Sequence, residues 1–137
     1  MKIASAFVAR AIRSGERVAR IDLRASLAQA DQPLELIFEG VQKTAASLHL
    51  RISLSGGPAG PVVAGDLFTY GEGPAEDAPA PERFFPLRLI LDITAAARQI
   101  ATPGPTEVFL EILDGHGREL SDESLFIQQV ELHTPDE

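Results

Sequence analysis

Apolar and polar residues alternate with a period of two along much of this chain, and no other feature constrains its fold as strongly. The clearest case runs from Leu48 to Leu54, where His49, Arg51 and Ser53 separate leucines and an isoleucine. Because successive side chains of a β-strand point to opposite faces of a sheet, this alternation is typical of a strand with one face in the core and the other in water. Further strands are predicted over 17–24, 34–39, 62–70, 84–91, 107–113 and 125–132.

The segment 62–100 joins two of these strands and organises the rest of the chain. Between the two strands lies the loop 71–82, GEGPAEDAPAPE, which is acidic and poor in large apolar side chains, so we expect it to be mobile on the surface. After the second strand, Asp92 or Thr94 can cap a short helix over 95–100. The sequence therefore predicts a pair of core strands with a loop in water between them.

The N-terminal segment 1–16 fits two kinds of secondary structure. Ile3, Phe7 and Ala11 are spaced as on one face of a helix, but a strand fits the same residues equally well. With about seven strands, one short helix and no βαβ rhythm, the predicted fold class is all-β, an antiparallel β-sandwich. A chain of 137 residues is long enough for one hydrophobic core, so we expect a single domain over 1–137.

The charge balance limits the classes of partner. A net charge of −8 argues against nucleic acid and against an anionic membrane surface, since both require a positive field. The N-terminal apolar run between Lys2 and Arg10 is short for a signal peptide, and no later stretch is apolar enough to span a bilayer. We therefore expect a cytoplasmic protein with no nucleic-acid or membrane partner.

The residues that could carry chemistry do not form a recognisable motif. The chain has no cysteine, and its histidines, His49, His116 and His133, lack the short spacing of a metal site. No serine stands in a G-x-S-x-G setting, and the acidic loops lack the spacing of a calcium loop. We therefore expect no metal, no cofactor and no enzymatic activity.

Two aromatic residues stand where the strand 62–70 meets the acidic loop. Phe68 and Tyr70 share one face of that strand with Asp66. They have two interpretations: rim aromatics whose rings are covered by the fold, or aromatics offered to a pocket of a partner protein.

Two stretches of the chain, AGDLFTYG at 64–71 and FFPLRLILDIT at 84–94, carry a family resemblance. They resemble the C-terminal β-sandwich domain that follows the copper domain in molluscan haemocyanins, some tyrosinases and plant polyphenol oxidases, the type-3 copper family. The resemblance extends to earlier and later strands, LELIFEGV, SLHLRISLSG, EVFLEILD and SLFIQQVEL. The residues that match the family pattern are Ala64, Gly65, Phe68, Gly71 and Leu91 to Thr94.

The resemblance implies a role without catalysis, because the copper domain and its histidines are absent from this sequence. It implies an accessory subunit or chaperone that docks on a separate tyrosinase-like type-3 copper oxidase and covers its active site. The candidate partner-binding residues are Tyr70, Phe68, Phe84 and Phe85. Copper delivery is less expected, since the single methionine is Met1 and copper(I) prefers soft ligands. A self-associating homo-oligomer or a small-ligand-binding sandwich with no copper connection stays open as the alternative.

Overall fold

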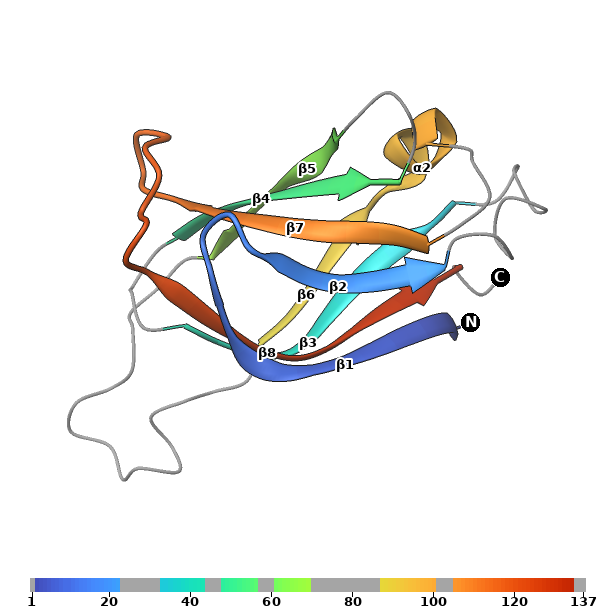
Figure 1. The fold of residues 1–137 in the computed structure, drawn as a ribbon, viewed down its shortest axis with the longest axis horizontal. Helices are drawn as coiled ribbons and strands as arrows, with labels where there is room; N and C mark the ends of the chain where they lie inside the picture. The colour runs from blue at the N-terminus through green and yellow to red at the C-terminus, as the bar shows by residue number, and fades with distance from the viewer. Residues whose placement is uncertain are drawn as a thin grey trace.

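Two antiparallel sheets of four strands face each other in the computed structural model (Figure 1). The structure describes residues 2–22, 33–43, 48–56, 61–69, 87–100 and 105–134. The strands are β1 (Lys2–Arg13), β2 (Arg17–Asp22), β3 (Glu35–Lys43), β4 (Leu48–Ser55), β5 (Val62–Thr69), β6 (Leu87–Asp92), β7 (Pro105–Leu113) and β8 (Ser124–His133). One short helix, α2 (Thr94–Ile100), follows β6. The predicted all-β sandwich is confirmed.

The order of the strands is that of a jelly roll. Sheet A runs β1-β8-β3-β6 and sheet B runs β2-β7-β4-β5. Apart from the β4–β5 hairpin, every strand is followed in the chain by a strand of the other sheet, so the chain winds around both sheets together, as in a double Greek key. The edge strands β1 and β2 lie side by side along one side of the sandwich, and β5 and β6 along the other (Figure 1).

The N-terminal segment is a strand and not the helix that its spacing also allowed. Strand β1 pairs with β8 from Lys2 to Arg13, which brings the described strands to eight, against the seven expected. A β-bulge interrupts the pairing between Phe7 and Arg10, and Ala9 in the bulge has a positive φ of 46°. A bulge adds one residue to a strand, so the alternation of inward and outward side chains changes register at that point. The period of two is therefore not visible in the sequence of this segment.

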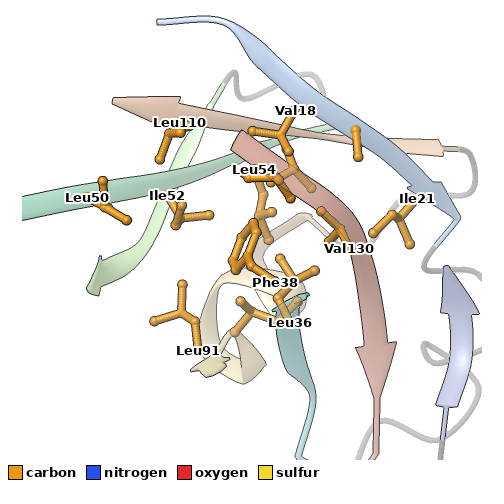
Figure 2. Packing of buried hydrophobic residues seen from close by; sticks show 14 of the residues in the cluster. Val18, Ile21, Leu36, Phe38, Leu50, Ile52, Leu54, Leu91, Leu110 and Val130 are labelled. Carbon is orange, nitrogen blue, oxygen red and sulfur yellow. The ribbon is translucent and has the colours of Figure 1, made fainter. Parts of the chain in front are cut away.

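The core lies between the sheets, where the inward residues of both meet. In β4 the residues Leu48, Leu50, Ile52 and Leu54 are all buried, as their alternation predicts. Figure 2 shows the ring of Phe38 among side chains of both sheets; among the described residues it is the largest fully buried side chain. Close packing of branched apolar side chains from two faces is what holds such a sandwich together.

The pairing in sheet A is interrupted at one level on both sides of β8. The β3–β6 pairing shifts between Phe38 and Val41, close to the level at which β1 bulges. Here Gly40 has a φ of 63°, and a Cβ placed on it would lie 2.6 Å from the Cβ of Gln128 on β8. A side chain at this position would collide with the neighbouring strand, so this break in the β3–β6 register requires glycine.

The predicted helix start is confirmed at the end of β6. Asp92 Oδ1 accepts hydrogen bonds from the Thr94 backbone N–H at 2.9 Å and from its hydroxyl at 2.6 Å. The hydroxyl oxygen of Thr94 also accepts the N–H of Leu34 at 2.9 Å, and the N–H of Ile93 reaches the Leu34 carbonyl at 2.9 Å. The junction is therefore tied to the start of β3. In the described parts of the chain, no helix has the length and apolar character to cross a membrane.

Candidate functional site

Four side chains gather on the outer face of the β4–β5 hairpin, and we call them the Phe68 cluster: His49, Arg51, Asp66 and Phe68. Antiparallel pairing sets His49 directly opposite Phe68 and Arg51 directly opposite Asp66. Residues opposite one another on one face of a sheet lie close enough for their side chains to touch. The cluster is thus a consequence of the hairpin register.

Aromatic stacking and hydrogen bonds join the four side chains. The rings of His49 and Phe68 stack with centroids 4.5 Å apart and planes inclined by 22°. The Nε2 of the same histidine lies 2.7 Å from Asp66 Oδ1, in a hydrogen bond, and Arg51 Nε donates to that oxygen at 3.1 Å. His49 therefore links the aromatic ring to the charged pair.

The carboxylate of Asp66 is stabilised in its ionised form. Desolvation raises the pKa of Asp66, but the hydrogen bonds from His49 and Arg51, with the positive charge of Arg51, outweigh it and hold the pKa below its ordinary value. Asp66 therefore stays charged in mildly acidic solution, and it holds the imidazole of His49 in place under Phe68.

The site lies on an edge of the sandwich that exposes apolar surface. Phe68 is 53% exposed and Val63, on the same strand, is 56% exposed, with Asp66 between them on the outer face. Strand β5 is an edge strand of sheet B, so among the described strands only β4 pairs with it in that sheet. An exposed aromatic with a fixed ring and paired charges around it has the character of a protein-binding surface.

The structure places one of the four candidate partner-binding residues. Phe68 points outward on the same face as Asp66, as predicted. Tyr70, Phe84 and Phe85 lie outside the described residues, as do the acidic loop 71–82 and the start of the strand predicted over 84–91. Strand β6 is described from Leu87 onward.

Sequence reasoning missed the neighbours of Phe68. It assigned His49 and Arg51 to the outward face of their strand but did not connect them with the aromatic. The register beside the glycine-rich connection, with Leu54 opposite Val62, would put His49 opposite Leu67 if it continued unchanged. A register shift between Ile52 and Ser53 brings His49 opposite Phe68 instead, and the sequence alone did not signal it.

The histidines are spread over different parts of the fold. His49 belongs to the Phe68 cluster on sheet B, whereas His133 lies on the outer face of sheet A, with its Nε2 2.6 Å from Glu131 Oε1. That hydrogen bond, with a further one from Gln129, lowers the pKa of Glu131 despite its partial burial. His116 lies in the turn after β7, where Asp114 accepts its backbone N–H. Within the described ranges, no three His, Asp or Glu side chains converge as metal ligands would.

No protein-family model matches this chain, and no curated protein matches it either. The likeness to the haemocyanin and tyrosinase sandwich therefore stays a prediction from the residues that carry it.

Proposed function

We propose that this chain is a non-catalytic accessory protein that docks through the Phe68 cluster on a separate tyrosinase-like type-3 copper oxidase and covers its active site. The observation that carries the proposal is the exposed ring of Phe68, held by His49. Exposed aromatic anchors supply much of the affinity of protein interfaces, and an anchor that is already ordered loses less entropy on binding.

The described residues of the family resemblance include several with structural roles, and Phe68 differs from them. A Cβ placed on Gly65 would lie 2.8 Å from the Cδ1 of Leu91, so the two matching stretches pack against each other. Ile93 is buried, and Asp92 and Thr94 fasten the start of α2. Each of these residues stabilises the fold, whereas about half of the Phe68 side chain is exposed on the outer face of β5.

This division supports a partner-directed role for Phe68. Burial of an aromatic ring is strongly favourable, so a half-exposed phenylalanine that is kept in one orientation is suited to a pocket elsewhere. The charges of Arg51 and Asp66 beside it are mutually paired and would form the polar rim of the contact.

The role that we propose for the chain is to cover the active site of the oxidase, and not to deliver copper to it. The sequence has no cysteine, and Met1 is its single methionine, so it offers none of the clustered soft ligands that copper(I) transfer uses.

Co-expression with the tyrosinase-like oxidase encoded nearest to this chain tests the proposal. The chain should co-purify with the oxidase, and phenol oxidation by the complex should rise when the chain is removed by mild denaturant or competition. Unchanged copper content together with altered activity would support a covering role. An oxidase whose complex formation, activity and copper content are all indifferent to the chain would contradict the proposal.

Self-association is the second candidate, and it is favoured by apolar side chains on other edge strands. Phe7 on β1 is 76% exposed and Ile90 on β6 is 46% exposed. Edge strands with exposed apolar groups are the usual sites of strand pairing between copies. Light scattering during size-exclusion chromatography decides this: a stable dimer in the absence of oxidase would favour it, and a monomer would exclude it at the concentration used.

A further inference from the structure

A cleft of about 350 Å³ opens between the edge strands β1 and β2, on the side of the sandwich opposite the Phe68 cluster. Its walls include Phe7, Arg10, Arg17, Val18, Ala19 and Arg20. The volume lies within the range of small-ligand sites, which runs from roughly 300 to 1,000 Å³. The cleft plays no part in the docking proposed above.

The fold brings these residues together at the corner where the chain passes from sheet A to sheet B. The two strands are joined by a tight turn at Ser14 and Gly15, and the Gly15 N–H anchors the turn to the carbonyl of Leu110 at 2.7 Å. The bulge at Ala9 then turns Arg10 toward β2, where its Nη2 donates to the carbonyl of Arg17 at 2.7 Å.

The cleft has an excess of positive charge. Arg17 and Arg20 both bond to Glu107 Oε1, at 3.3 and 3.0 Å, and Arg10 lies beside them. Three arginines line the cleft and two of them share the carboxylate of Glu107, which leaves about two positive charges in a chain whose net charge is −8. The hydrogen bond from Arg20, with that from Arg17, lowers the pKa of Glu107. This carboxylate is therefore ionised at neutral pH, and the excess of positive charge in the cleft stays at about two.

The guanidinium groups keep capacity for a ligand. Each carries five N–H donors, and among the described residues Arg10, Arg17 and Arg20 each engage one terminal nitrogen in hydrogen bonds. The paired N–H groups of a planar guanidinium can donate to two oxygens of one phosphate group. The excess of about two positive charges matches the charge of a doubly ionised phosphate monoester. The exposed ring of Phe7 offers an apolar wall beside them.

We propose that the cleft between β1 and β2 binds a small phosphate monoester, with its phosphate on Arg10, Arg17 and Arg20 and its apolar or aromatic body against Phe7. A ligand with a single negative charge should bind more weakly, since it leaves one positive charge uncompensated. Binding should weaken as salt rises, because the arginines are solvent-exposed and their field is screened.

Isothermal titration of the full-length chain with phenyl phosphate tests the proposal, with inorganic phosphate and benzoate as comparison probes. Phenyl phosphate should bind more tightly than either. The double variant R17Q/R20Q should weaken phenyl phosphate at least tenfold, whereas E107Q should strengthen it several-fold by removing the competing carboxylate. F7A should weaken phenyl phosphate but leave inorganic phosphate unchanged.

Arg118→Gln is the matched control, because it removes an exposed arginine in the turn after β7 that does not line the cleft. Its affinity for phenyl phosphate should equal that of the wild type. Absence of binding at millimolar phenyl phosphate in low salt, or equal losses in R17Q/R20Q and R118Q, would overturn the proposal. Circular dichroism of each variant confirms that a loss of affinity does not come from unfolding.

Discussion

The rings of His49 and Phe68 stack 4.5 Å apart across the β4–β5 hairpin, and the same histidine is hydrogen-bonded to Asp66. This arrangement gives a half-exposed aromatic side chain a stacked support from the neighbouring strand. The register of the hairpin, with His49 opposite Phe68 and Arg51 opposite Asp66, is what assembles it.

Replacing His49 with Ala should weaken binding to the oxidase by about threefold to tenfold. The aromatic pair is worth about 0.5–1.5 kcal/mol, and its loss lets the ring of Phe68 rotate before it is bound. Surface plasmon resonance measures the affinity, and chemical denaturation measures the stability of the free variant. An affinity equal to that of the wild type would show that the stack does not prepare Phe68 for binding.

Replacing Thr94 with Val should lower the free energy of unfolding by about 1–3 kcal/mol. Valine keeps the shape of threonine but removes the oxygen that accepts the N–H of Leu34, and a buried donor left without a partner costs about this much. Thr94→Ser keeps the oxygen and serves as the control in urea unfolding. Equal stabilities of the two variants would mean that this hydrogen bond does not hold the junction.

Replacing Gly40 with Ala should destabilise the protein by about 2–4 kcal/mol. The added methyl group meets Gln128 at 2.6 Å, and the positive φ of this residue disfavours any side chain. Gly115→Ala is the control, because a Cβ there meets nothing within 4 Å, and its effect should stay within about 0.5 kcal/mol. Thermal unfolding of both variants compares them directly, and similar melting temperatures would contradict the packing argument.

The stability that Asp92 contributes should disappear on acidification. Hydrogen bonds from the hydroxyl and the N–H of Thr94 lower the pKa of Asp92 below its ordinary value of 3.8. A lowered pKa in the folded state means that the unfolded state binds the proton more tightly, so the contribution is complete above the ordinary pKa and is lost as the pH falls through the folded pKa. Urea unfolding of the wild type and D92N at pH 7 and at about pH 2–3 should show a smaller difference at the lower pH. A difference that does not change with pH would rule out this linkage.

Period-two alternation predicts most of the fold because one face of each strand is buried and the other is wet. It works from Leu48 to Leu54, where pairing continues on both sides of the strand. It fails in β1, because the bulge around Ala9 changes which residues face inward. The alternation of residue types along a strand shows which side chains are buried. Whether the strand contains a bulge depends on how it pairs with neighbouring strands, and the alternation does not show this.

The candidate sites are less predictable from sequence, because each joins strands through tertiary pairing. Phe68 was identified as a candidate on its own strand, but its support by His49 depends on the hairpin register. The arginine cleft depends on the corner between the sheets, where Arg10 of β1 comes beside Arg17 of β2. The spacing of residues within one strand does not predict that these two arginines lie side by side.

The affinity of the oxidase for F68A, compared with wild type and with F7A, tests the central claim most directly. Phe7 is an exposed phenylalanine on the opposite side of the sandwich, so its replacement controls for general loss of apolar surface. We expect F68A to weaken binding by about 30-fold or more, as for an interface anchor worth about 2 kcal/mol, and F7A to change it by less than about twofold. Equal affinities for wild type and F68A, or no binding of the wild type, would contradict docking through Phe68.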